Sequence, residues 1–262
     1  MTSLIPAATV LLVRDAPDLE VLMVERAYQI DFAAGALVFP GGKTAPEDAD
    51  PAWARALPAG HGLSALEVAL RVAAIREAFE ESGLLLARDR GAGAGGALIT
   101  PAQLAPLIAF RDAVASGSVS FLGLMQEGRF ELALDALIPF AHWITPKGMP
   151  KRFDTHFFIA RTPVDQDAAH DGHEAVDAVW LEPAAALSAA REGRRKIIFP
   201  TRLNLELLAQ SSSAETAMAM AAARPVVTVE PTITSDADGV AWLSIPEDAG
   251  YGAVRARLDE VT

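Results

Sequence analysis

The sequence predicts one α/β domain over residues 1–262, a sandwich in which helices cover a mixed β-sheet. Three observations favour this class. About half of the residues (51%) are apolar, which is enough to build a core. Strand-like runs lie on both sides of one strongly patterned helix at 64–83. Further helical segments follow those strands, and they can cover the other face of the sheet.

The composition excludes several kinds of site. The chain has no cysteine, so it has no disulfide, thiolate metal site or cysteine nucleophile, and any metal needs oxygen or imidazole ligands. A net charge of −12 argues against binding nucleic acid or anionic membranes. An anionic small substrate remains compatible, because a few arginines and a metal reverse the charge locally. The N-terminal apolar run is too short for a membrane span, and we expect a cytoplasmic protein.

The first third of the chain predicts a hairpin and a glycine turn. Apolar, β-branched runs at 7–13 and 20–25 are expected to pair. A short strand at 36–39 ends at Pro40-Gly41-Gly42, a turn that permits close backbone approach. Proline and glycine recur through 43–63, which is predicted to be an irregular insertion.

The central helix has clear start and stop signals. Ser64 and Glu67 have the spacing of a capping box, and Gly83 suits the position after the last turn. An extended segment is expected at 84–87. The predicted apolar stripe consists of Leu66, Leu70, Ala73, Ala74 and Phe79.

The middle of the chain predicts a helical insertion and the remaining strands. The glycine-rich run 91–96 is a flexible link. A helical insertion is expected over 100–128, with one helix at 101–116 and a second at 119–126. Strands are expected at 137–144, 152–160 and 175–181, and a helix at 184–192.

Residues 200–262 are predicted to form a C-terminal extension. A helix begins near 202 and ends near 210 or continues through the Ala- and Met-rich run to 223. Strand-like runs at 226–229 and 240–245 surround a turn at 236–239, which predicts a β-hairpin.

The acidic end of the 64–83 helix carries the strongest chemical signal. Glu77, Glu80 and Glu81 can share one side of the helix, where they repel one another unless a cation binds. Carboxylate oxygens favour Mg²⁺ or Mn²⁺, and the Gly42 carbonyl is a further candidate ligand. Arg76, four residues before Glu80, can orient that carboxylate. The alternative is a solvated helix end, although acidic residues there oppose the helix dipole.

This pattern resembles the signature of the Nudix hydrolases. Residues 76–84, REAFEESGL, match its second half at every defined position, and Gly41-Gly42 lies upstream. The usual short spacing is replaced by residues 43–75, so the first glutamate of the signature falls at Asp48 or near Glu67. The resemblance implies a Nudix-type α/β/α sandwich. It also implies catalytic roles for Arg76 and for the three glutamates at 77, 80 and 81, which would bind metal.

A second resemblance narrows the subgroup. Residues 22–27, Gly35 and 39–42 are similar in spacing to the box of the coenzyme A diphosphatases, although Asp31 replaces one arginine. The long insertion, the segment 152–158 and the terminal run 236–251 resemble the peroxisomal coenzyme A diphosphatase-like branch. The sequence ends in EVT, without the peroxisomal tripeptide, so a bacterial member is expected.

The resemblance implies water attack on a P–O–P bond, assisted by divalent cations. Coenzyme A or an acyl-CoA is the leading substrate and would give 3′,5′-ADP and phosphopantetheine. Another nucleoside diphosphate derivative, such as ADP-ribose or NADH, and a catalytically silent ligand sensor are the alternatives. A homodimer through the added helices or the C-terminal hairpin is an open option.

Residues outside the helix complete the predicted site. Glu174, just before the strand at 175, is the loop candidate for a general base, with an exposed loop acid as the alternative. Arg26 is chosen for a phosphate contact, because it belongs to the coenzyme A-type box. Lys151 and Arg152 start a strand, and Arg152 could clamp a phosphate with two donors. Gly41 and Gly42 would approach the substrate through their backbone.

Several further polar residues have simpler expectations. His170 and His173 flank the Glu174 loop and are expected to be surface histidines. His156 is expected to be a satisfied core or edge residue. The basic run at 194–196 is either a 3′-phosphate contact or a solvated turn. Trp143, Trp180 and Phe153 are assigned to the core, with stacking on adenine as the alternative.

Overall fold

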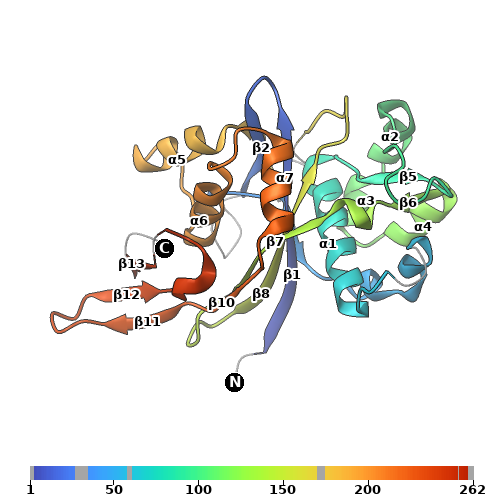
Figure 1. The fold of residues 1–262 in the computed structure, drawn as a ribbon. Helices are drawn as coiled ribbons and strands as arrows, with labels where there is room; N and C mark the ends of the chain where they lie inside the picture. Colours follow the sequence, from blue (N-terminus) through green and yellow to red (C-terminus); the bar gives the residue numbers. More distant parts are fainter. Residues whose placement is uncertain (1–2, 27–34, 58–60, 170–174, 253, 259–262) are drawn as a thin grey trace.

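A mixed β-sheet with helices on both faces forms the centre of the computed structural model (Figure 1), which describes residues 3–26, 35–57, 61–169, 175–252 and 254–258. The strand order is β10-β7-β8-β1-β2-β3, with β4 paired to β1 and β9 paired to β2. The predicted α/β sandwich is therefore confirmed. The strands are β1 (Leu4–Asp15), β2 (Leu19–Arg26), β3 (Leu37–Val38), β4 (Gly41–Lys43), β7 (Ile138–Ile144), β8 (Arg152–Arg161), β9 (Ala175–Leu181) and β10 (Thr228–Val229).

Strand β1 lies at the centre because it is apolar on both faces. It runs parallel to β8, from Leu4 opposite Arg152 to Val13 opposite Arg161. Its last residues pair with β2, which confirms the predicted hairpin, and residues 7–9 in its middle pair with β4. Alternate side chains enter the two cores: Val10 packs on the side of the central helix and Leu11 on the opposite side.

The central helix, α1 (Ala65–Ser82), covers one face of the sheet as predicted. The Ser64 hydroxyl accepts from the Glu67 backbone N–H, the Glu67 carboxylate accepts from the Ser64 N–H, and Gly83 has φ 76°. The predicted apolar stripe was wrong at Leu66, which is 55% exposed because it lies in the first turn, before the buried part of the helix begins at Val68.

The insertion at 43–63 is more ordered than predicted. It contains two 3₁₀ helices, η1 (Pro46–Ala49) and η2 (Pro51–Ala56), each started by a proline at its first position. Trp53 is buried against Phe121, with ring centroids 5.7 Å apart. The Glu47 carboxylate accepts from the Phe121 N–H at 2.9 Å. The two insertions therefore pack on one another beside α1.

The 100–128 segment forms three helices, α2 (Pro101–Ile108), α3 (Arg111–Ala115) and α4 (Phe121–Glu127). The prediction of one helix over 101–116 was wrong, because α2 ends at Ile108 and Phe110 is the N-cap of a separate helix α3. A small sheet of β5 (Ala87–Asp89) and β6 (Phe130–Leu132) joins the ends of this region. The extended segment predicted at 84–87 forms strand only from Ala87, and the three buried leucines before it lie outside the strand.

Helices α5 (Pro183–Arg191), α6 (Phe199–Leu208) and α7 (Ala214–Ala223) cover the opposite face (Figure 1). The alternative of a continuous helix from 202 to 223 was wrong. Ser213 is the N-cap of a separate helix α7, and its hydroxyl accepts from the Thr216 N–H. A C-terminal hairpin with its turn at 236–239 is present, but its first strand was wrong: β11 (Thr232–Ser235) pairs with β12 (Ala241–Ser244), whereas β10 from the 226–229 run pairs with β7 in the main sheet. Strand β13 (Arg255–Arg257) adds to β12 and makes a three-stranded sheet. Two 3₁₀ turns, η3 (Leu134–Ala136) and η4 (Glu247–Ala249), complete the described elements. None of the described helices combines the length and apolar character that a membrane crossing requires.

Candidate active site

The three glutamates of α1 are buried rather than solvated. Their exposed fractions are 8% for Glu77, 9% for Glu80 and 3% for Glu81. The helix presses this side against β4 and η1, so the acids lie between secondary-structure elements and not at a free helix end. Burial of charged carboxylates is costly unless compensating charges surround them. The solvated-end alternative was therefore wrong.

Arg76 connects these acids to the 43–63 insertion. Its Nε and Nη2 donate to the two carboxylate oxygens of Asp48 at 2.9 and 3.0 Å. Its Nη1 donates to Glu77 at 2.9 Å and to Glu80 at 3.0 Å, which confirms the contact predicted from the four-residue spacing. The guanidinium also donates to the Lys43 carbonyl at 2.9 Å. Arg76 is 8% exposed, so a single buried cation orients three carboxylates.

The electrostatics of Arg76 follow from these contacts. Burial by itself lowers the pKa of the guanidinium, but the hydrogen bonds to Asp48 and the charges of Glu77, Asp48 and Glu80 outweigh it. The pKa of Arg76 is therefore raised, and the cation is fixed in its charged form.

The structure separates the two candidates for the first acid of the signature. Asp48 is 1% exposed and binds Arg76, and its Oδ2 also accepts from the Ala45 N–H at 2.7 Å. Glu67 lies at the other end of α1, where a backbone hydrogen bond from Ser64 lowers the pKa of its carboxyl. Asp48 is thus the acid that joins the site, although it lies 28 residues before Arg76.

The two glycines allow β4 to approach the acids closely. The Gly41 N–H donates to Glu81 Oε2 at 2.9 Å. A Cβ on Gly42 would lie 2.5 Å from the Glu77 carboxylate. A Cβ on Gly41 would instead lie 2.5 Å from the Ala8 carbonyl oxygen and 2.6 Å from the Thr9 Cα, both of which belong to the backbone of β1.

We expect Gly42→Ala to affect mainly activity and Gly41→Ala to affect mainly thermal stability. In Gly42→Ala the methyl group can be accommodated by moving the flexible Glu77 side chain, so activity should fall about a hundredfold through misplacement while the melting temperature changes little. Gly41→Ala meets backbone and should lower the melting temperature. Thermal unfolding and kcat/KM on both variants check this. Full activity in Gly42→Ala would contradict the assignment of Glu77 to the site.

Arg111, which lies in the helical insertion, also supports the acidic end of α1. It is 8% exposed, and its Nη2 donates to the Glu80 carbonyl at 2.9 Å. A cation at this position satisfies a terminal carbonyl and opposes the negative end of the helix dipole. No sequence spacing links Arg111 to Glu80, so sequence reasoning missed it.

The remaining predicted residues lie elsewhere or outside the described part of the chain. Glu174, His170 and His173 fall outside the described residues. Arg26 ends β2, and its backbone pairs with Ala175, the first residue of β9.

Arg152 begins β8 as predicted and Lys151 directly precedes it, but their described contacts are not with the acids. Arg152 donates to the Thr145 carbonyl at 3.0 Å and to Glu230 at 2.6 Å. Lys151 is exposed, with its ammonium 5.8 Å from the centre of the Phe153 ring. A phosphate contact by either residue stays a prediction.

The structure also shows the surroundings of the basic run 194–196 and of the two tryptophans Trp143 and Trp180. Arg194 and Lys196 are exposed, as the solvated-turn alternative expects, whereas Arg195 is half-buried and pairs with Glu25 and Asp177. A 3′-phosphate contact by this run stays a prediction. Trp143 is buried as predicted, whereas Trp180 is half-buried beneath Arg14, whose guanidinium lies 4.1 Å from the ring centre.

The donor set suits a hard divalent cation. Glu77, Glu80, Glu81 and Asp48 bring four carboxylates around Arg76, so these five residues carry an excess of negative charge. Oxygen ligands of this kind match Mg²⁺ and Mn²⁺. The carboxylates of the three helix glutamates would supply such ligands.

This chain is similar to known proteins in sequence. The model of the NUDT19 Nudix domain matches residues 60–205. The acyl-coenzyme A diphosphatase NUDT19 of Gallus gallus is 32% identical over 235 residues, covering 69% of this chain and 61% of the relative. The Xenopus laevis protein of the same name is 28% identical and is covered over 54% of its length, so this chain spans little more than half of these relatives.

A solved structure resembles most of the fold. The Nudix hydrolase from Alicyclobacillus acidocaldarius is 29% identical, with a TM-score of 0.68. The alignment covers 86% of this chain and 100% of that structure.

Proposed function

Since this chain belongs to the NUDT19 Nudix domain family, we propose that it is a pyrophosphohydrolase that cleaves the P–O–P bond of a nucleoside diphosphate derivative with Mg²⁺ or Mn²⁺. The buried acidic cluster around Arg76 is the observation that carries this proposal. It brings hard oxygen ligands together at residues 76–84, which match the second half of the family signature, and at Asp48. Water must attack a phosphorus atom whose surrounding charge has been neutralised.

Coenzyme A or an acyl-CoA is the substrate that we favour. Two relatives are named acyl-coenzyme A diphosphatase, and the box at residues 22–27, Gly35 and 39–42 resembles that of coenzyme A diphosphatases. Cleavage would give 3′,5′-ADP and phosphopantetheine or its acylated form. Asp31, which replaces an arginine of the box, keeps ADP-ribose and NADH as alternative substrates.

Metal binding and proton transfer would be carried out by different residues. Glu77, Glu80 and Glu81, with the Gly42 carbonyl, would hold the cation. Arg76 orients Glu77 and Glu80, and the Gly41 N–H donates to Glu81. A bound cation would neutralise the diphosphate and lower the pKa of a water ligand. Glu174 is proposed as the base that accepts a proton from the attacking water.

Phosphate binding is assigned to the backbone of Gly41 and Gly42 and to Arg26. Arg26 ends the strand that pairs with Ala175, so its backbone lies beside the residue that follows Glu174. Lys151 and Arg152 would contact a more distant part of the substrate. Arg152 would have to exchange its ion pair with Glu230 for a substrate phosphate.

A product-resolved assay tests the function. The full chain is incubated with coenzyme A, an acyl-CoA, ADP-ribose and NADH, each with Mg²⁺ or Mn²⁺, and products are separated by chromatography. We expect 3′,5′-ADP and phosphopantetheine from coenzyme A. Preferential cleavage of ADP-ribose or NADH would replace the substrate assignment. If no product forms from any compound while binding persists, the protein is a ligand sensor.

A further inference from the structure

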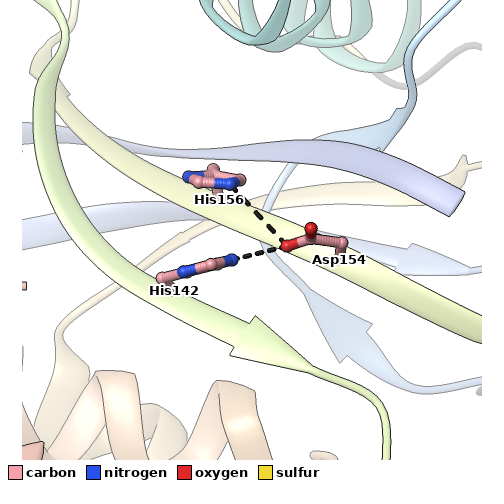
Figure 2. A group of neighbouring side chains, drawn as sticks. All are labelled: His142, Asp154 and His156. Atoms are coloured by element: carbon pink, nitrogen blue, oxygen red, sulfur yellow. Dashed lines mark hydrogen bonds and ion pairs between the residues drawn. The ribbon is translucent and has the colours of Figure 1, made fainter. Parts of the chain in front are cut away.

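A second group of ligand side chains lies on the sheet, away from the acidic cluster. His142 of β7 is paired with His156 of β8, and Asp154 precedes His156 by two residues on the same strand. Residues two apart on a strand face the same side, so all three side chains share one face (Figure 2). Sequence reasoning missed this trio, because it treated His156 singly and the antiparallel register that adds His142 is a tertiary feature.

The three ligand atoms are close to one another. His142 Nε2 lies 2.5 Å from Asp154 Oδ1, and His156 Nε2 lies 3.7 Å from the same oxygen. The two imidazole rings are stacked, with centroids 4.0 Å apart. Two imidazoles and one carboxylate oxygen thus lie within 4.8 Å of each other.

We propose that His142, Asp154 and His156 form a binding site for one divalent transition-metal ion of the Zn²⁺ type. Two imidazole nitrogens with one carboxylate constitute a known three-ligand set for zinc, which leaves one position for water. Imidazole ligands suit Zn²⁺, Ni²⁺ and Co²⁺ better than Mg²⁺. The site therefore differs in metal preference from the all-carboxylate cluster on α1.

Thr228 supports this assignment from the neighbouring strand β10. Its Oγ1 lies 2.8 Å from His142 Nδ1, which fixes the orientation of the ring. If Nδ1 donates to Thr228, the lone pair of Nε2 faces the Asp154 oxygen, and only a proton or a cation between them makes that contact favourable. Metal-ligating histidines commonly donate their other ring nitrogen to such a partner.

Metal binding requires only small side-chain movements. Ligand atoms of a tetrahedral zinc ion are roughly 3.3 Å apart, because each bond is about 2.0–2.1 Å long. The Asp154 oxygen must therefore retreat by roughly 0.8 Å from His142 Nε2. The His156 ring must rotate about χ2, a torsion with a broad energy well. The side chains of Asp154 and His156 are 30% and 31% exposed, which leaves room for both movements.

The charges that face the site also permit a cation. Helix α1 presents Arg71 and Glu67 towards His156, and the charge of Glu67 opposes that of Arg71. The Arg71 guanidinium is also held over the Phe158 ring, 5.0 Å from its centre. The opposite charges of Arg71 and Glu67 offset each other. The carboxylate of Asp154 therefore leaves a net negative charge at the group of His142, Asp154 and His156.

The proposed site is distinct from the acidic cluster but lies on the same side of the sheet. Gly42 pairs with Ala8, and Ala8 pairs with His156 on the other side. Two strand spacings separate Gly42 from His156, a backbone distance of roughly 10 Å. Ala8 belongs to the core beneath α1, so both sites are on the face that this helix covers.

Cobalt spectroscopy tests the proposal on the full chain after removal of metals with a chelator. Co²⁺ is titrated into the protein, and the visible d–d absorption of a nitrogen-coordinated, low-symmetry ion is recorded. We expect one equivalent of Co²⁺ to give this band and Zn²⁺ to abolish it by competition. His142→Asn and His156→Asn should each lose the band, and Glu81→Gln should keep it.

Two controls separate this site from other metal binding. A variant in which His61, His170 and His173 are all replaced by alanine should keep the band, because the proposed site uses the other two histidines of the chain. Circular dichroism and thermal unfolding verify that the two asparagine variants are folded. Absence of the band in the wild type, its survival in both asparagine variants, or its loss in the triple alanine variant would each overturn the proposal.

Discussion

Glu81→Gln and Glu77→Gln are each expected to lower kcat about a thousandfold or more, since divalent-metal stabilisation of charge supplies several kcal/mol to the barrier. Each substitution keeps the shape of the side chain and removes one negative charge from the cluster that would hold the cation. In Glu81→Gln, the amide oxygen of the new side chain can still accept from the Gly41 N–H, as Glu81 Oε2 does at 2.9 Å. The fold should therefore survive.

Metal binding can be measured without turnover. In the wild type, Mn²⁺ should raise the melting temperature, because a ligand that binds only the folded state stabilises it. The rise should be strongly reduced in Glu81→Gln and Glu77→Gln. Glu67→Gln is the matched control, because its carboxylate caps the other end of α1 and a glutamine can keep that cap.

The outcomes discriminate between hypotheses. Retained turnover in Glu81→Gln or Glu77→Gln would remove these acids from the metal site. Loss of turnover with an unchanged Mn²⁺ response would point to a role in proton transfer instead. A large effect of Glu67→Gln on kcat would mean that Glu67 takes part in the reaction, although in the structure Asp48 and not Glu67 contacts Arg76.

The helix that carries the acids was predictable because its signals are local. Ser64, Glu67 and Gly83 define its ends within one short stretch, and all three behave as their residue types dictate. The shared position of the three glutamates could be predicted for the same reason, since their spacing places them on one side of a helix. The predicted strands of the central sheet likewise follow from runs of apolar residues that the two cores require.

The partners of the acids were not predictable, because they come from distant parts of the chain. Asp48 reaches Arg76 from the 3₁₀ helix η1, and proline spacing in the sequence gives no tertiary position for that helix. Arg111 reaches the end of α1 from the helical insertion. The parallel pairing of β10 with β7 also has no local signal.

Replacement of Arg76 by methionine should destabilise the fold by about 3–5 kcal/mol, since it leaves buried carboxylates without their compensating cation. Asp48 and Glu77 accept from this guanidinium, and Glu80 accepts from it at 3.0 Å. Arg76→Lys should fall between the wild type and methionine, because an ammonium group cannot reproduce the paired contact with Asp48. Urea denaturation in the presence of a chelator gives the unfolding free energies.

Arg71→Met is the matched control on the same helix. Arg71 is 7% exposed, as buried as Arg76, but burial lowers the pKa of its guanidinium, and its hydrogen bond runs to the Glu67 carbonyl at 3.2 Å. A lowered pKa means that the folded state disfavours the charge of Arg71, whereas the raised pKa of Arg76 means that it favours that charge. Removal of Arg71 should therefore cost much less than removal of Arg76. Equal losses would show that packing of the aliphatic stems, and not the carboxylate network, is what arginine contributes to α1.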